Sequence, residues 1–264
     1  MDLRLGGKRA LVTGSTAGVG FAAALGLTRE GASVVLNGRS PERVEDAVRR
    51  VREAEPGGEV SGVAADLGTV EGIGQLLRQV PETDVLVNNL GIFEPKDFGE
   101  ITDEDWFRFF ETNVLSGVRL ARHYLPGMKD RDWGRIVFVS SESAIQIPPE
   151  MIRYGVTKTA QLAIARGLAE TAAGTGVTVN SVLPGPTGSE GVTTFVENLA
   201  REQGMDAAAM EEEFFRTARP SSLLGRFIEP AEVAELIVFM CSPASSATNG
   251  AAMRADGGVV RSAF

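Results

Sequence analysis

The sequence has one cysteine, Cys241, and one histidine, His123. A single cysteine excludes a disulfide within the chain, and reduced thiols are typical of the cytoplasm, where we expect this protein. A zinc site made of histidine and cysteine needs several such ligands, so we expect no metal site of this kind. A Ser-His-Asp triad would depend on His123 alone.

Long apolar runs and an excess of positive charge are also missing. No stretch approaches the ~18 apolar residues that read as a membrane-spanning helix, and the first residues, MDLRLGGKRALVTG, lack the pattern of a signal peptide. The chain has 26 Lys and Arg against 35 Asp and Glu, a net charge of −9. Nucleic-acid binding needs a basic face for the phosphates. We therefore expect neither a membrane nor a nucleic acid as partner.

What the chain does have is a regular alternation of strands and helices. The expected strands are Arg9–Thr13, Ser33–Asn37, Glu59–Ala64, Asp84–Asn88, Arg135–Ser140, Val177–Val182 and Ala251–Ala255. The segments between them, such as Pro41–Glu55 and Thr102–Met128, have the composition of helices. This order predicts a doubly wound α/β fold, with a parallel sheet of about seven strands and helices on both faces. No linker divides the chain, so we expect one domain over residues 1–264.

The segment Thr187–Arg226 departs from the alternation. It is long, acidic and helical in pattern, and its spaced apolar positions are Phe195, Leu199, Met210, Phe214 and Phe215. Ligands of open α/β sheets bind outside the carboxyl ends of the strands. We expect this segment to form a helical flap over that edge, and the alternative is an ordinary surface excursion.

A glycine-rich turn, TGSTAGVG from Thr13 to Gly20, lies between the first expected strand and an alanine-rich helix. Glycine there lets backbone N–H groups approach a pyrophosphate, because a Cβ would block the approach. The layout predicts a Rossmann-type NAD(P) site, and a tight turn without a ligand is the alternative. The expected contacts in this turn are Gly14, Ser15, Thr16, Gly18, Val19 and Gly20.

The end of the second expected strand reads Leu36-Asn37-Gly38-Arg39. A site for NAD usually has an acidic residue here that binds the ribose hydroxyls. Gly38 lacks that acceptor, and the forked cation of Arg39 suits a 2′-phosphate. We therefore expect NADP rather than NAD. The alternative is that Arg39 is a solvated charge beside Glu42.

The third expected strand leads into Asp66 and Leu67, which we place at the adenine end of the cofactor. Asp66 could accept a hydrogen bond from the adenine amine. It could equally be the N-cap of the next helix, since Gly68 and Thr69 follow it.

Tyr154 and Lys158 stand four residues apart at the start of an expected helix, and so share one face. A free tyrosine has a pKa near ~10, which is too high for proton exchange at neutral pH. A nearby ammonium lowers that pKa, so the pair makes a sensible acid/base unit. The spacing alone is common in helices, where it has no catalytic meaning.

Together, the glycine-rich turn, Asn88-Asn89-Leu90-Gly91, Asn113, Ser141, Tyr154/Lys158, Pro184-Gly185 and Asp256-Gly257-Gly258 resemble the short-chain dehydrogenase/reductase family, in its single-domain branch. The resemblance covers essentially the whole chain. It implies hydride transfer between a nicotinamide and a carbonyl or alcohol carbon. Leu90 departs from the family's usual alanine, and Thr157 from its usual serine.

The resemblance also implies roles for single residues. Ser141, thirteen positions before the tyrosine, would polarise the substrate oxygen, and Tyr154 would donate the proton. Lys158 would bind the nicotinamide ribose and lower the pKa of the tyrosine, and Asn113 would hold a water that reprotonates the lysine. Further cofactor contacts would come from Asn89, Gly91, Pro184, Gly185 and either Thr187 or Ser189.

The substrate is the least constrained part. The chain is similar in general to 3-oxoacyl-(acyl carrier protein) reductases, but acidic residues gather where the mouth of the site is expected. In Glu94–Glu111 these are Glu94, Asp97, Glu100, Asp103, Glu104, Asp105 and Glu111. They are either solvated helix faces or a sign of a neutral or cationic substrate. We expect a small or medium apolar ketone or alcohol.

Two other classes of function remain open. One is a cofactor-binding sensor or scaffold, which would need no Ser141, Tyr154 or Lys158. The other is a sugar-nucleotide epimerase, which the glycine spacing and the length of 264 residues disfavour. The apolar helices after Thr102 and Met151 resemble those that pack between subunits in the family, so we expect a homotetramer or a dimer.

Overall fold

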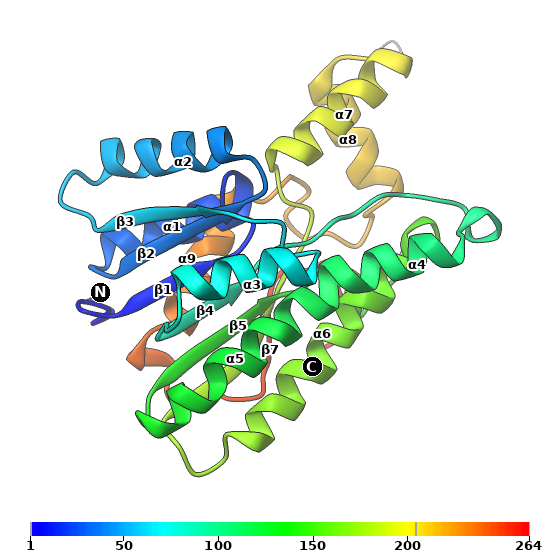
Figure 1. Ribbon diagram of the computed structural model, residues 1–264. Helices are drawn as coiled ribbons and strands as arrows, with labels where there is room; N and C mark the ends of the chain where they lie inside the picture. Colours follow the sequence, from blue (N-terminus) through cyan, green and yellow to red (C-terminus); the bar gives the residue numbers. More distant parts are fainter. Residues whose placement is uncertain (1, 204, 264) are drawn as a thin grey trace.

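The computed structural model describes residues 2–203 and 205–263, apart from the side chains of residues 194, 195, 197–199, 202 and 203. A seven-stranded parallel sheet forms its centre, in the order β3-β2-β1-β4-β5-β6-β7 (Figure 1). The strands are β1 Arg9–Val12, β2 Ser33–Gly38, β3 Val60–Ala64, β4 Val85–Asn88, β5 Gly134–Val139, β6 Val177–Pro184 and β7 Ala252–Ala255. The expected sheet is confirmed.

Alternating side chains of the strands face two separate cores. In β1, Ala10 and Val12 pack into one core and Leu11 into the other. Because successive residues of a strand point to opposite faces, the apolar runs cover both faces of the sheet. The register pairs Ala10 with Val34 of β2 and with Val85 of β4. The strand order therefore reverses beside β1, where doubly wound sheets bind their ligands.

Helices cover both faces. Buried residues of α1, α2 and α9 belong to one core, and those of α3, α5 and α6 to the other. The bounds are α1 Gly18–Arg29, α2 Pro41–Ala54, α3 Val70–Gln79, α4 Asp103–Phe110, α5 Ser116–Asp130, α6 Ile152–Thr171 and α9 Pro230–Met240. No helix in the described part of the chain is both long and apolar enough to cross a membrane.

The stretch expected as one helix over Thr102–Met128 has a different inner structure. Helices α4 and α5 are joined by a π-helical turn, Glu111–Leu115. Thr102 begins α4 with a capping box, in which its hydroxyl and the Asp105 carboxylate accept from each other's backbone N–H. The wider π turn contains Asn113, and such turns often mark functional sites.

The segment expected as a flap is helical. It contains α7, Glu190–Gln203, and α8, Ala207–Thr217, which rise beside the carboxyl edge of the sheet (Figure 1). Of its predicted apolar positions, Met210 and Phe215 are buried, and Phe214 and Phe215 pack against Phe227. The side chains of Phe195 and Leu199 lie outside the described residues.

Candidate active site

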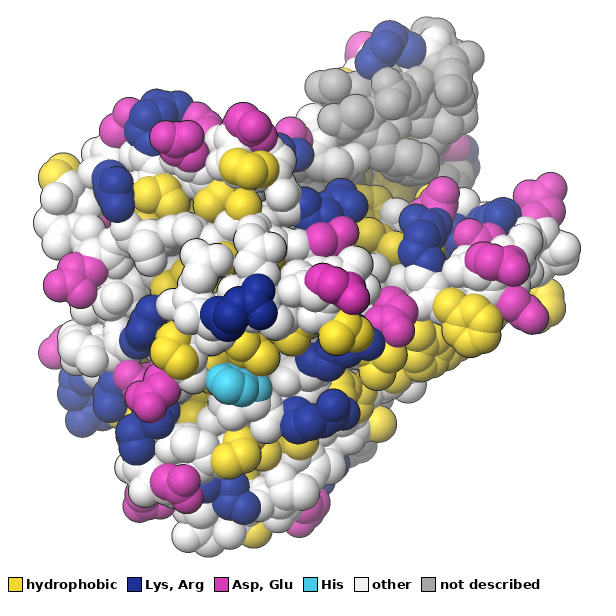
Figure 2. Space-filling model, viewed as in Figure 1, with side chains coloured by type: hydrophobic (Ala, Val, Ile, Leu, Met, Phe, Trp, Pro, Cys, Tyr) yellow, Lys and Arg dark blue, Asp and Glu magenta, His cyan; other side chains and the backbone are white. Residues whose placement is uncertain are grey.

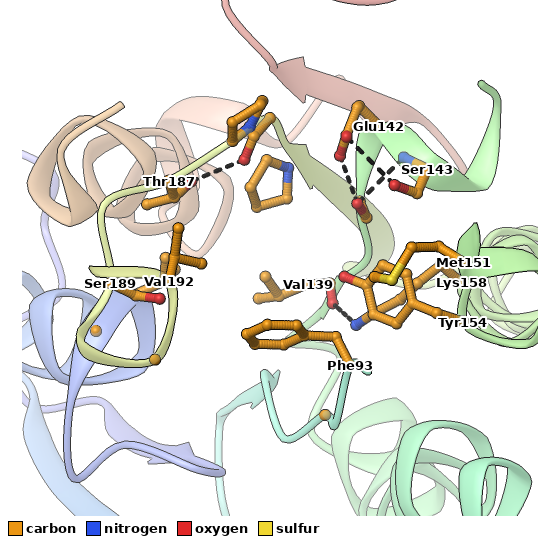
Figure 3. A pocket seen from close by; sticks show the side chains of 18 of the residues that line it. Phe93, Val139, Glu142, Ser143, Met151, Tyr154, Lys158, Thr187, Ser189 and Val192 are labelled. Atoms are coloured by element: carbon orange, nitrogen blue, oxygen red, sulfur yellow. Dashed lines mark hydrogen bonds between the residues drawn. The ribbon is translucent and has the colours of Figure 1, made fainter. Parts of the chain in front are cut away.

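Two adjoining hollows open at the carboxyl edge. The larger, of about 820 Å³, lies where β1, β4, β5 and β6 end, and the smaller, of about 270 Å³, lies beside the ends of β1, β2 and β3. Arg43, Asn89 and Gly91 border both. Figure 3 shows the larger hollow, with Phe93, Met151, Tyr154 and Lys158 facing Thr187, Ser189 and Val192. Together the two hollows have room for a long ligand, with one part of it in each hollow.

The glycine-rich turn lies between the two hollows. Gly18, Val19 and Gly20 line the larger one, and Gly14 and Thr16 the smaller. A Cβ on Gly20 would lie 2.4 Å from Nδ2 of Asn89 and 2.6 Å from the carbonyl oxygen of Gly14, so no side chain fits there. The Asn89 amide in turn donates to the carbonyl oxygens of Thr13 and Gly14, both at 2.9 Å. These bonds hold the turn against the end of β4.

Ser15, an expected cofactor contact in the turn, borders neither hollow. Its side chain is fully buried, and its hydroxyl donates to the carbonyl oxygen of Val12 at 2.7 Å. The same hydroxyl accepts from the backbone N–H of Asn37 at 3.0 Å. Ser15 therefore fastens the turn to β1 and β2 through its side chain.

The end of β2 contributes an open, basic corner. Arg39 lines the smaller hollow together with Ser40 and Arg43, and its side chain is exposed. The ion pairs of the described residues do not include Arg39, and Glu42 is bonded to the Ser40 hydroxyl at 2.6 Å instead. Gly38 touches Thr16 so closely that a Cβ would come within 2.5 Å of it. The described residues that line this corner therefore present a guanidinium to a ligand and no carboxylate.

Asp66 is not the N-cap of the helix that follows it. Its carboxylate accepts from the backbone N–H of Gly68 at 3.0 Å, in a local turn. The N-cap of α3 is Thr69, whose hydroxyl accepts from Gly72, so the N-cap alternative is wrong. Asp66 itself is exposed, while its neighbours Ala65 and Leu67 line the smaller hollow.

The two serines after β5 point in different directions. The Ser140 hydroxyl donates to the carbonyl oxygen of Lys158 at 2.8 Å, which anchors α6 to the strand. The Ser141 hydroxyl accepts from the backbone N–H of Ser143 at 3.1 Å and donates to the Glu142 carboxylate at 2.6 Å. The Ser141 hydroxyl is therefore bonded to a side chain at the pocket wall, whereas the hydroxyl of Ser140 is bonded to the backbone.

Tyr154 lies on the first turn of α6, with its ring edge against Phe93 at 6.5 Å between centroids. Burial raises the pKa of Tyr154 above its ordinary range, although the hydroxyl of Ser141 and the charge of Arg219 act in the lowering direction. The net shift in the pKa of Tyr154 is upward, opposite to the lowering expected from Lys158, because desolvation outweighs the contacts that lower the pKa. Tyr154 therefore keeps its proton at neutral pH.

Lys158 lies beneath the tyrosine, with Nζ 5.5 Å from the centre of its ring. Its side chain is buried, and Nζ donates to the carbonyl oxygen of Val139 at 2.9 Å. Desolvation lowers the pKa of Lys158 to about 7. The ammonium is thus only partly charged at neutral pH, which helps to explain why it does not lower the pKa of the tyrosine.

Asn113 is buried in the π turn close to Lys158. Its amide bridges to the backbone of Ile92, with Oδ1 accepting at 2.7 Å and Nδ2 donating at 3.0 Å, and Nδ2 also donates to Thr157. The carbonyl oxygen of Asn113 accepts from Gln161, whose Oε1 lies 3.4 Å from Nζ of Lys158. Gln161 therefore links the lysine to the π turn directly, a contact that sequence reasoning missed.

The loop after β6 forms the opposite wall. Gly185 packs against the backbone of Asp256, where a Cβ would come within 2.5 Å of the carbonyl oxygen. The Thr187 hydroxyl donates to the carbonyl oxygen of Gly185 at 2.9 Å. Ser189 lies beside Gly18 of the glycine-rich turn, and Pro184 also lines the pocket. These residues line the part of the larger hollow where we expect the cofactor to bind.

Three of the seven acids in Glu94–Glu111 form ion pairs in the described part of the chain. Glu94 and Asp105 pair with Arg153, and Glu111 pairs with Arg119. In the flap, the ion pair of Glu190 with Arg43 crosses the opening of the pocket. The charged residues that line the larger hollow are Arg43, Lys158 and Arg219 against Glu142, Glu150 and Glu190. None of the seven acids of Glu94–Glu111 is among the described residues that line the larger hollow, so their charge gives little support to a cationic substrate.

Fold and site define a class: a doubly wound α/β protein in which Ser141, Tyr154 and Lys158 meet beside a glycine-rich turn. The family model described as short chain dehydrogenase matches residues 8–200, and the chain belongs to this family of oxidoreductases.

Similar proteins span essentially the full chain. The uncharacterized oxidoreductase YvaG of Bacillus subtilis is 49% identical over 264 residues and covers 100% of both chains. The 3-oxoacyl-[acyl-carrier-protein] reductase FabG of Aquifex aeolicus is 31% identical, over 98% of this chain and all of its own. L-sorbose reductase from Gluconobacter frateurii, solved with NADPH and L-sorbose, has a TM-score of 0.94 at 32% identity, covering 99% of this chain and 100% of its own.

Proposed function

We propose that the protein is an NADP(H)-dependent oxidoreductase that interconverts a carbonyl compound and its alcohol. The observation that carries this proposal is the meeting of Ser141, Tyr154 and Lys158 at one wall of the larger hollow, opposite the glycine-rich turn. A sensor or scaffold needs no proton donor beside its cofactor. The acid/base set therefore favours an enzyme.

A bound nicotinamide would supply the hydride that adds to the carbonyl carbon. Ser141 would donate a hydrogen bond to the carbonyl oxygen, where negative charge develops. Tyr154 would then give its proton to that oxygen, so that the product is a neutral alcohol and the tyrosine is left as phenolate. Burial keeps Tyr154 protonated beforehand, which suits the reductive direction.

Lys158 would bind the ribose next to the nicotinamide and return a proton to the tyrosine. Its pKa of about 7 allows it to hold or release that proton near neutral pH. Asn113 would hold the relay in place together with Gln161, which already bonds to both the lysine and the π turn. We also propose that Asn113 holds a water molecule through which Lys158 is reprotonated.

The preference for NADP rests on the corner after β2. Arg39 faces the smaller hollow with no carboxylate partner among the described residues, and a guanidinium binds phosphate well. The solved L-sorbose reductase with NADPH agrees with this choice. The other cofactor contacts we propose are Gly14, Ser15, Thr16, Gly18, Val19, Gly20, Asp66, Leu67, Asn89, Gly91, Pro184 and Gly185, with Thr187 or Ser189 at the carboxamide.

We further propose that residues 1–264 act as one NAD(P)-binding domain, in a cytoplasmic homotetramer. The substrate would be a small or medium ketone or alcohol whose apolar part meets the flap side of the pocket. Val192, Phe214 and Phe227 line that side, and Phe93 faces them from the wall beside Tyr154. A 3-oxoacyl thioester on a carrier protein is the more specific alternative.

The experiment is a panel of ketones, alcohols and a 3-oxoacyl thioester, assayed for turnover with NADPH and with NADH. Tyr154→Phe should reduce turnover at least ~1000-fold while leaving NADPH binding intact, because only the proton donor is lost. The control is Tyr124→Phe at the other tyrosine of the chain, which bonds to Val80 far from the pocket. Retained activity in Tyr154→Phe refutes the mechanism, and equal use of NADH refutes the cofactor choice.

A further inference from the structure

Glu142 is a buried carboxylate inside the pocket that hydride transfer does not require. It directly follows Ser141, lines the larger hollow, and is 4% exposed. Its Oε2 accepts from the Ser141 hydroxyl at 2.6 Å, and its Oε1 accepts from the Ser143 hydroxyl at 3.2 Å (Figure 3). Burying a carboxylate is costly unless it is paired, so its place beside the reacting atoms needs a reason.

Arg219, which follows the flap helices, supplies the charge that Glu142 needs. Its Nε lies 3.2 Å from Oε1, and both side chains are largely shielded from water. This bond joins two residues that are 77 positions apart in the sequence. Oε1 of Glu142 accepts from both Arg219 and Ser143. Among the described residues, Oε2 of Glu142 accepts only from the Ser141 hydroxyl.

The Ser141 hydroxyl cannot donate its single proton to Glu142 and to a substrate carbonyl at the same time. A serine hydroxyl has one hydrogen to donate, and polarising a substrate carbonyl requires Ser141 to turn it away from Glu142. Oε2 would then be left buried without a donor, which opposes binding of a plain ketone. A hydroxyl on the carbon next to the carbonyl can replace the lost bond, because both substrate oxygens then lie within reach of the Ser141–Glu142 pair. A carboxylate in the same position would be repelled.

We propose that Glu142 determines specificity by accepting a hydrogen bond from a substrate hydroxyl adjacent to the reacting carbonyl, so that the protein acts on α-hydroxy ketones and, in reverse, on vicinal diols. The proposal rests on the proposed function. Glu142 neither gives nor takes a proton in the reaction, and its part is to choose and orient the substrate. The apolar side of the pocket takes the rest of the molecule.

The test compares 1-hydroxy-2-butanone with 3-pentanone, in which a methyl group replaces the hydroxyl, as substrates with NADPH. The wild-type protein should prefer the hydroxy ketone at least tenfold in kcat/KM. Glu142→Gln should bring that ratio close to one, because the amide is a weaker acceptor without charge. The ratio is taken within one preparation, so partial misfolding of a variant cancels.

Glu150→Gln is the matched control. Glu150 is an exposed carboxylate at the rim of the same hollow, so its loss changes the charge there but not the bond to Ser141. It should keep the wild-type ratio. Equal rates for both ketones in the wild type, an unchanged ratio in Glu142→Gln, or a preference for a keto acid would overturn the inference and leave the proposed function standing. Turnover of no panel compound with either nicotinamide would overturn both.

Discussion

Lys158 combines a positive charge with a buried position. Folding lowers its pKa from 10.5 to about 7, so between these pH values the unfolded chain holds more protons than the folded one. The free energy of unfolding must then rise with pH in this window, by up to about 1.4 kcal/mol per pH unit from this group. Below pH 7 the cost of burying the charge is fully present.

We expect Lys158→Met to remove this pH dependence. At pH 6 the variant should gain stability relative to the wild type, and the gain should shrink toward pH 9, where the wild-type lysine is neutral. Lost bonds to Val139 and Gln161 cost roughly 1–3 kcal/mol at every pH, so the difference between pH values is the readout. Urea unfolding at both pH values measures it.

The exposed Lys129 provides the control, since Lys129→Met removes a lysine that bonds only to the Thr171 carbonyl oxygen. Its effect on stability should be the same at pH 6 and pH 9. A Lys158→Met protein whose stability difference from the wild type does not change with pH would show that the lysine is not desolvated in the folded state.

At the scale of single residues, the sequence predicts identities better than environments. The resemblance to the family pointed to Ser141, and in the structure its hydroxyl donates to the Glu142 carboxylate, whereas that of Ser140 donates to the backbone of Lys158. The direction of the pKa shift of Tyr154 was wrong, since it depends on how much water the whole fold removes. Glu142 gave no signal at all, because its partner Arg219 is far away in the sequence.

At the scale of elements, the ends of the strands were predictable to within one or two residues. Runs of apolar β-branched residues favour buried strands over other structures. The π turn over Glu111–Leu115 was not predictable, since it differs from an α-helix by a local shift of hydrogen bonds that no residue type dictates. The cap of α3 was misplaced for a similar reason, because Asp66 and Thr69 are both good N-cap residues.

The loop between β4 and α4 is fastened to α6 by Arg153, next to the proposed acid Tyr154. Its side chain is 1% exposed, and its guanidinium lies 2.7 Å from Glu94 and 3.2 Å from Asp105, over the ring of Phe109. Arg153→Met should cost roughly 1–3 kcal/mol of unfolding free energy, because the buried guanidinium loses its contacts with two carboxylates. The loss stays below that of a broken buried ion pair, because Arg108 and Lys96 still pair with Glu94 and Asp105.

Arg108 offers a close comparison, as it pairs with the same two carboxylates from a half-exposed position. Arg108→Gln should cost at most about 1 kcal/mol, since exposed ion pairs contribute little. Urea unfolding of both variants tests the contrast. Similar losses in the two proteins would mean that Arg153 is held by packing rather than by its charge.

At the scale of the molecule, the site depends on topology more than on any local motif. All seven strands are parallel, so their carboxyl ends meet at one edge and bring Gly14, Asn89, Ser141 and Gly185 together from distant parts of the chain. The pattern of strands predicted the sheet, and the resemblance to the family predicted which residues meet at its edge. The net charge of −9 did not predict the charge of the site, because many of the acids near it pair with arginines that lie elsewhere in the sequence.

Exposed aromatic side chains near α4 point to a contact between subunits. Hydrophobic side chains cluster over α4 on the face shown in Figure 2, and Phe98 and Phe107 of this region are 62% and 69% exposed. A monomer rarely leaves such aromatic surface in water. If α4 packs between subunits, light scattering at micromolar concentration should give four times the 28.0 kDa of one chain.

Phe107→Asp should then shift the mass toward dimer or monomer, because a carboxylate would be buried without a partner in the contact. Val70→Asp is the control for a general effect of a new surface charge, since Val70 is 62% exposed at the start of α3 and is not part of α4. It should leave the mass unchanged. A wild-type monomer at micromolar concentration would refute the tetramer, and a tetramer that survives Phe107→Asp would move the contact away from α4.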